Sequence, residues 1–245
     1  MAFTAIVLAS SLATSVMSGV LGMAGGMILM AILVAIAPVS TAMVVHGAVQ
    51  ATSNGSRAWF LREHVAWRVL PAYLVGAAIA LAAFVVLLVV PNAAYVLIII
   101  GVFPWTARLV PRLNGLDVTQ PLTAFVCGAV VTGAQLFAGA SGPLLDVFYL
   151  NTPLNRHQII ANKALTQTLG HVLKLVYYGG VLTVPTNVSW PVLATAMLTA
   201  VVGARLGTRL LDRLDDQNFR KYSGWVILGV GAYCVVKGAA DLIRA

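Results

Sequence analysis

The chain consists of long apolar stretches separated by short polar connections. Several of the apolar runs approach the ~20 residues that a helix needs to cross the hydrocarbon core of a bilayer. The runs recur from end to end, at residues 3–17, 69–90, 94–102, 122–131, 192–202 and 224–236. This pattern predicts an all-α polytopic membrane protein in which no segment separates off as a soluble domain.

Composition agrees with this prediction. Of the 245 residues, 60% are hydrophobic and 9% are charged, whereas roughly a quarter of the residues in soluble domains are charged. The N-terminal run lacks the basic segment of a signal peptide and continues into more apolar sequence, so we interpret it as mature chain. Cys127 and Cys234 lie inside apolar runs, which favours buried thiols over a disulfide or metal framework.

The formal net charge of +8 is concentrated in some of the connections and absent from others. The positive-inside rule places connections rich in Lys and Arg at the cytoplasmic face. The connections near residues 91–95 and 183–190 contain neither residue. The charge therefore indicates topology and no nucleic-acid partner. The basic positions are Arg62, Arg68, Arg108, Arg112, Arg156, Arg209, Arg213, Arg220 and Lys221.

The loop charges assign a direction to six crossings, and two segments remain. The crossings cover about residues 41–61, 66–90, 93–111, 157–180, 188–211 and 222–243. Each of the remaining segments, roughly 3–37 and 119–152, is expected to begin and end on the same side of the membrane. At 1.5 Å per residue, each is too short for two full crossings and a turn. We expect hairpins of two short helices or broken helices bent at glycines, and about 7–8 transmembrane segments in total.

Both remaining segments contain a glycine-rich stretch, and the two stretches match at a single offset. Gly22 aligns with Gly139 and Gly25 with Gly142 (139 − 22 = 117; 142 − 25 = 117). The same offset aligns four polar residues of the first half with four polar residues of the second. In each half, the four residues are spaced so that they lie on one face of a helix. The pairs are His46 with Lys163, Gln50 with Gln167, Asn54 with His171 and Arg57 with Lys174. This indicates an internal repeat.

The two polar helices are expected to run in opposite directions, so the predicted repeat is inverted. Residues 1–112 would form the first copy, with its break at 22–26, and residues 113–245 the second, with its break at 139–143. Both copies would belong to one integral membrane domain. Inverted repeats with Gly- or Pro-interrupted segments at matching places are typical of the central site of a transporter.

The chemistry of the breaks favours an anionic ligand. Non-helical backbone at membrane depth persists only where it is packed in protein or lines a cavity. Pro143 suits the first turn of a new helix, which Ser141 or Gly142 could cap, and residues 27–36 would form a second helix after Gly26. Free N–H groups and helix dipoles at such starts attract anions.

The candidate substrate-binding residues combine these breaks with the two polar stripes. Lys163 would supply charge, Gln50 and Gln167 would supply directional hydrogen bonds, and Asp146, His46 and His171 are candidate proton carriers. No cofactor or metal is expected. The full set is Gly22, Gly25, Gly26, His46, Gln50, Asn54, Gly139, Ser141, Gly142, Asn162, Lys163, Thr166, Gln167 and His171.

Structural alternatives exist for most of these side chains. Gln50, Asn54 and Thr166 could join helices by hydrogen bonds, and Lys163 could simply pair with Asp146. The two histidines could be satisfied inside the bundle. Near the helix ends, three basic side chains could snorkel to the membrane surface. These are Arg57, Lys174 and Arg205.

The sequence resembles the TauE/SafE family of sulfite and organosulfonate exporters, also called the 4-toluene sulfonate uptake permease family. The resemblance rests on "GVLGMAGGMIL" and "AGASGPLL", each followed by a polar helix, and covers essentially the whole length. The first stretch has Ala24 where the commoner family form, GxGGG, has glycine. The resemblance implies a carrier of small sulfur-containing anions in the bacterial inner membrane, usually acting in export.

We therefore expect a secondary transporter that works by alternating access. The sequence has no GxxxxGK[ST] motif, so a proton gradient or the gradient of the anion itself would supply the energy. The identity of the anion and the direction of transport stay open. The partners would be the small anion and membrane lipid, and the small-residue faces at Gly76 and Gly203 could pack helices within a protomer or between protomers of a homodimer.

Three other functions were weighed. A passive anion channel would use the same site. The "GASG" of residues 139–142 also matches the GxSG motif of rhomboid-type proteases, with Ser141 as nucleophile and His171 as base. The repeat accounts for that motif, however, since the other copy has Ala24, and the Trp-Arg loop and Ala-His pair of rhomboids are missing. A metal-ion permease is disfavoured because the site is short of carboxylates.

Overall fold

The computed structural model describes residues 2–21, 24–109, 116–149, 151–182, 188–211 and 216–244, which form helices joined by short connections and contain no strand. The expected all-α fold is confirmed, and each of the six segments expected to cross the membrane is a helix. The α-helices are α1 (Ala2–Leu21), α2 (Ala24–Ile36), α3 (Val39–Phe60), α4 (Leu70–Leu87), α5 (Ala93–Leu109), α6 (Pro121–Ala138), α7 (Gly142–Val147), α8 (Arg156–Leu175), α9 (Trp190–Leu211) and α10 (Asp216–Arg244). Short 3-10 turns, η1 (Arg62–His64) and η2 (Trp67–Val69), precede α4, and a π-helical turn, η4 (Val176–Val181), extends α8.

Within the described ranges, four helices are long and apolar enough to cross a membrane, at Ala2–Gly19, Trp67–Leu87, Pro121–Ala138 and Trp190–Gly207. The outward faces of these helices carry exposed large apolar side chains, such as Val86 on α4 and Leu198 on α9. Exposed apolar area of this kind suits contact with lipid tails. The chain is a multi-pass membrane protein. Helices α3 and α8 are as long, with 22 and 20 residues, but carry buried polar side chains.

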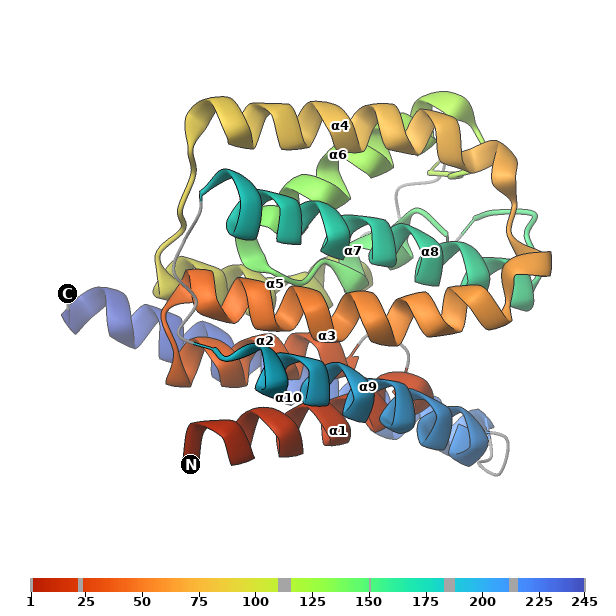
Figure 1. Cartoon of the computed structure of the whole chain (residues 1–245). Helices are drawn as coiled ribbons and strands as arrows, with labels where there is room; N and C mark the ends of the chain where they lie inside the picture. Colours follow the sequence, from red (N-terminus) through yellow and green to blue (C-terminus); the bar gives the residue numbers. More distant parts are fainter. Residues whose placement is uncertain are drawn as a thin grey trace.

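The order of the elements repeats along the chain. A long helix, a break, a short helix, a polar helix and two further helices occur first as α1 to α5 and then as α6 to α10. Helix α1 packs on α9 and α6 on α4, while α3 packs on α8 and α5 on α10, so each major contact joins the two halves. Figure 1 shows α3 and α8 side by side with their colours running in opposite directions.

The two glycine-containing segments are interrupted, as both alternatives expected, but the helices on the two sides of each break differ in length. Helices α1 and α6 have 20 and 18 residues, whereas α2 and α7 have 13 and 6. Gly139 ends α6 with φ 79°, and its N–H donates to the carbonyl of Gln135 at 2.9 Å. This left-handed cap is a conformation that glycine adopts at little cost. The break therefore follows a helix of nearly full length instead of dividing the segment equally.

Glycines also allow the closest helix contacts. A Cβ on Gly25 would overlap the backbone of α1 at Thr14 and Ser18, so α2 can fold back on α1 only with glycine at this position. Gly76 lies against the backbone of α6, and Gly203 lies against the backbone of α1. The two small-residue faces noted in the sequence are therefore packed inside the protomer.

Two of the connections expected at the cytoplasmic face, between α3 and α4 and before α8, lie at one end of the molecule, on the right of Figure 1. There the ring of His64, between α3 and α4, lies 5.2 Å from the ring of His157 at the start of α8. At the other end, the hydroxyl of Tyr177 donates to the carbonyl of Val89 at 2.8 Å. Arg112, Arg213 and residues 183–187 lie outside the described residues.

Candidate functional site

The largest group of buried polar side chains lies where α3 and α8 cross, and others lie on α1 and α6. On α3 and α8 these side chains recur every three or four residues, so they form one face, and the two faces meet because α3 packs on α8. The loop before α8 fixes where this face begins, since Asn155 and Gln158 form a capping box at its start. The buried set comprises His46, Gln50, Ser53 and Asn54 on α3, and Asn162, Thr166, Gln167, His171 and Lys174 on α8.

A chain of hydrogen bonds joins the two glycine breaks through this crossing. The Nε2 of His46 donates to the carbonyl of Gly26 at 2.8 Å. The Nδ1 of His46 accepts from the ammonium of Lys174 at 2.8 Å, and the same ammonium donates to the carbonyl of Gly139 at 2.9 Å. A carbonyl only accepts, so His46 must carry its hydrogen on Nε2. The first break, the two polar helices and the second break are thus linked directly.

Two polar atoms next to this chain have no hydrogen-bond partner. The ring of His171 lies 5.2 Å from that of His46, and its buried Nδ1 is unpaired. The amide nitrogen of Gln50 is also buried and unpaired, although its side-chain oxygen accepts from Asn54 at 3.4 Å. Gln50 faces the first break, because a Cβ on Gly26 would lie 3.4 Å from its side chain. Unpaired buried polar groups mark a place where a ligand or water completes the bonding.

The second break is organised by Gln135 on α6. Ser141 is the residue that caps α7, but its hydroxyl makes no capping bond and instead donates to Oε1 of Gln135 at 2.7 Å. The expected cap by the side chain of Ser141 is therefore wrong, because this side chain is oriented toward Gln135 and not toward the first N–H groups of α7. The amide nitrogen of Gln135 reaches toward the carbonyl of Gln167 on α8, 3.5 Å away. Gly142 begins α7 and Pro143 lies in its first turn, as expected.

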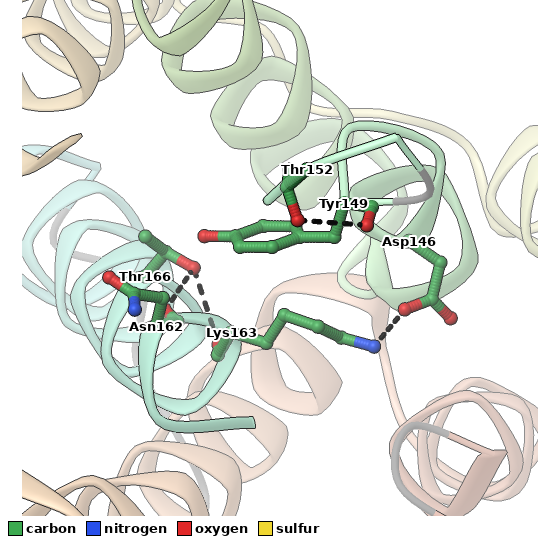
Figure 2. A network of polar contacts seen from close by, with 6 residues as sticks. All are labelled: Asp146, Tyr149, Thr152, Asn162, Lys163 and Thr166. Atoms are coloured by element: carbon green, nitrogen blue, oxygen red, sulfur yellow. Dashed lines mark hydrogen bonds and ion pairs between the residues drawn. The ribbon is translucent and has the colours of Figure 1, made fainter. Parts of the chain in front are cut away.

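Lys163 lies in a separate polar group, which Figure 2 shows. Its ammonium forms an ion pair with Asp146 on α7, with 21% and 40% of the two side chains exposed. The pairing considered as an alternative is thus present. Thr166 donates to the carbonyl of Asn162 at 2.9 Å, within α8 itself. The hydroxyl of Tyr149 points toward Thr166 in the same view.

Snorkelling, the alternative considered for Arg57 and Lys174, is not observed for Lys174, and Arg57 is partly buried. The side chain of Lys174 is 0% exposed, and it bonds Gly139 at the end of α6. Arg57, at the matching position of α3, donates to the carbonyl of Ser18 near the end of α1 at 3.1 Å. Positive groups are favourable at the C-terminal ends of helices, where the dipole is negative. Both basic residues therefore stabilise the long helix that precedes each break.

A family comparison places this arrangement among known proteins. The family model for the sulfite exporter TauE/SafE matches residues 7–234, which include both breaks and both polar helices. The chain belongs to the TauE/SafE family. No curated protein and no solved structure matches it. The resemblance inferred from the paired glycine-rich stretches of this TauE/SafE protein is confirmed, and with it membership of a family of transporters.

The structure of this TauE/SafE protein divides the predicted site residues into neighbouring groups. Gly26, His46, Gln50, Asn54, Gly139 and His171 lie around the central hydrogen-bond chain. Lys163 pairs with Asp146, while the side chains of Asn162 and Thr166 donate to carbonyls of α8 itself. Gln167 and Ser141 both contact Gln135. Gly25 packs on α1, Gly142 begins α7, and Gly22 lies outside the described residues.

Sequence reasoning missed two residues of the TauE/SafE site. Gln135 was not considered, although a glutamine inside an apolar run is unusual enough to be noticed, and it matches Ser18 at the repeat offset (135 − 18 = 117). The central position of Lys174 was also missed, because its place near the end of the predicted helix is equally compatible with a side chain that snorkels. Among the described residues, no three His, Cys, Asp or Glu side chains are close enough to hold a metal ion.

Proposed function

We propose that this TauE/SafE protein is a secondary transporter that exports small sulfur-containing anions, such as sulfite or C2 organosulfonates, across the bacterial inner membrane. One observation carries the proposal. The ammonium of Lys174 is fully buried, and the partners recorded for it are neutral, a ring nitrogen of His46 and the carbonyl of Gly139. A buried cation without a countercharge is costly, and a bound anion would remove that cost.

The unpaired groups next to the central hydrogen-bond chain suit the oxygens of a sulfonate or sulfite. The amide nitrogen of Gln50 is a donor, and Nδ1 of His171 becomes one in the matching tautomer. Leaving such groups unpaired costs about 1–3 kcal/mol each, so the anion would gain affinity from both. Backbone N–H groups at the breaks, at Gly25, Gly26 and Gly142, would complete the site, as would Gly22.

Lys163 would enter the site in a second step. It now pairs with Asp146, and an approaching anion competes with that carboxylate for the ammonium. Asn162, Thr166 and Gln167 lie on the same helix and would donate or orient hydrogen bonds after the exchange. Release of Asp146 would also make it available to accept a proton.

Alternating access would follow from two inverted halves, residues 1–112 and 113–245. The repeated order of elements, the exchange of packing partners between the halves and the opposite directions of α3 and α8 support this architecture. One half would rock against the other around the central crossing. A proton on Nδ1 of His46 would remove the acceptor that Lys174 uses, which offers a way to couple proton movement to this motion.

Counterflow in proteoliposomes tests the proposal. Vesicles loaded with unlabelled sulfoacetate are diluted into a trace of labelled sulfoacetate, and transient accumulation of label above equilibrium is expected. Sulfite, taurine and isethionate are tested as competitors. Accumulation without overshoot would instead identify a passive anion channel. Absence of flux when each of the four anions is labelled in turn, from protein that keeps its helical circular dichroism spectrum, would refute the proposal.

A further inference from the structure

A cavity of about 330 Å³ lies where α3 ends against α9, away from the central crossing. Its lining includes three arginines, Arg57 from α3 and Arg205 and Arg209 from α9. The last two are four residues apart and so lie on the same face of α9. The described residues that line the cavity include no carboxylate. Three positive groups around one space repel each other unless an anion lies between them.

Two of the three guanidinium groups are already oriented by neighbours. Arg57 uses Nη2 for its bond to Ser18, and an arginine has five N–H donors, so the others can serve a ligand. The guanidinium of Arg205 lies over the ring of Phe60, 5.1 Å from its centre, a cation–π contact that leaves its edge free to donate. Side chains held in place lose less freedom when a ligand binds. The cavity is therefore prepared for an acceptor-rich group.

We propose that this cavity is a second anion site, which binds an oxyanion group at the end of the molecule that carries the connection between α3 and α4. Guanidinium groups bind sulfonate, phosphate and carboxylate oxygens through paired hydrogen bonds. Two sources carry such a group, a free organosulfonate and the headgroup of an anionic lipid. The apolar part of the wall, from Phe60, Leu61 and Ala204, accommodates the carbon chain of either.

Arg57 connects the cavity to the first break. Arg57 lines the cavity and also holds the carbonyl of Ser18, a few residues before the chain reaches residues 22–26. A bound oxyanion that draws Arg57 toward the cavity would weaken this contact at the end of α1. A role in collecting the transported anion rests on the proposed function, whereas binding at the cavity does not.

Calorimetric titration of sulfoacetate into the full-length protein in phosphatidylcholine nanodiscs tests the free-anion source. In a Lys174→Gln background, which lacks the proposed central site, we expect the double variant Arg205→Gln/Arg209→Gln to bind at least tenfold more weakly, since it removes two charge-assisted contacts. The matched control is Arg68→Gln, which removes an exposed arginine at the same end outside the cavity and should change the affinity less than twofold. The variant Arg205→Lys/Arg209→Lys keeps the charge but loses the paired N–H donors of guanidinium. Its affinity for sulfoacetate should lie between those of the double glutamine variant and the control.

Native mass spectrometry with phosphatidylglycerol tests the lipid source. The wild type should retain at least one more phosphatidylglycerol than the double glutamine variant, and phosphatidylglycerol in the nanodiscs should suppress the arginine-dependent binding of sulfoacetate. Binding that depends on the arginines in either experiment supports the site and identifies whether its oxyanion group comes from a free anion or from a lipid. Equal binding with and without the two arginines in both experiments would overturn it.

The failures of the two proposals are distinguishable. If the double variant binds sulfoacetate as the wild type does, while Lys174→Gln abolishes binding and flux, the cavity proposal fails and the transport proposal stands. If no anion is transported but arginine-dependent binding persists, the reverse holds. Thermal melting of each variant is measured alongside. A melting temperature within a few degrees of the wild type excludes misfolding as the cause of a loss.

Discussion

The Nδ1 of His46 lies 2.8 Å from the ammonium nitrogen of Lys174, although the two residues are 128 positions apart in the chain. One belongs to α3 and the other to α8, so their contact ties the two halves together at the centre of the molecule. Because His46 accepts in this contact, the two groups cannot both carry a proton at these nitrogens without placing two charges in contact.

Replacing Lys174 should impair anion binding more than replacing any other lysine. In Lys174→Gln the buried charge is lost, and a charge-assisted hydrogen bond of about 1.5–3 kcal/mol corresponds to roughly 10- to 150-fold in affinity. Counterflow of sulfoacetate should fall by at least tenfold. Lys237→Gln, which removes an exposed lysine paired with Asp241 on α10, is the control and should transport normally. Equal activity of both variants would exclude Lys174 from the site.

Placing a carboxylate at position 50, one helical turn from His46, should abolish anion binding without unfolding the protein. Gln50→Glu has the same shape, and its negative charge would compete with a substrate anion at the central site. We expect loss of the thermal shift caused by sulfoacetate, with an unchanged or higher melting temperature of the empty protein. The exposed residue before α6 provides a control, Gln120→Glu. A normal thermal shift in Gln50→Glu would separate Gln50 from the anion site.

The ion pair between Lys163 and Asp146 should contribute little to stability. Both side chains are partly exposed, and pairs of this kind contribute about 0.2–1 kcal/mol. A double-mutant cycle with Lys163→Ala and Asp146→Ala, followed by equilibrium unfolding in mild detergent, should therefore give a small coupling energy. A coupling above about 2 kcal/mol would mean that the pair holds α7 against α8, and that Lys163 does not leave Asp146 to meet an anion.

The contact of α2 with α1 should depend on Gly25. In Gly25→Ala the new methyl group overlaps backbone atoms of Thr14 and Ser18, which cannot move as a flexible side chain would. We expect destabilisation of at least about 1–3 kcal/mol, the range for overpacked sites, measured as a lower melting temperature. Gly133→Ala on α6 has open space around the added methyl group. It should be neutral or stabilising by up to about 1 kcal/mol, because alanine favours a helix.

Much of the helical framework was predictable because its signals are local. Apolar runs of membrane-spanning length identified the helices, and the expected crossing at residues 41–61 corresponds to α3 (Val39–Phe60). The offset of 117 residues also predicted the start of α8 relative to that of α3 (156 − 39 = 117). The same local pattern could not give the lengths of the two helices that flank each break. The end of α6 is set by the left-handed cap at Gly139, and this cap depends on where the following chain packs.

The roles of the individual polar residues depended on tertiary structure. From the sequence, Lys163 and Lys174 are two lysines on one face of a helix, and the central role was assigned to Lys163. Packing decided otherwise, since α7 brings Asp146 to Lys163 while α3 brings His46 to Lys174. Likewise, the hydroxyl of Ser141 donates to Gln135. A capping rule based on neighbouring residues instead predicts that this hydroxyl bonds a backbone N–H of α7. Periodicity and hydropathy determine which residues form a helix and which share a face. The partner that each of them meets is set by how distant helices cross, and no local pattern encodes that crossing.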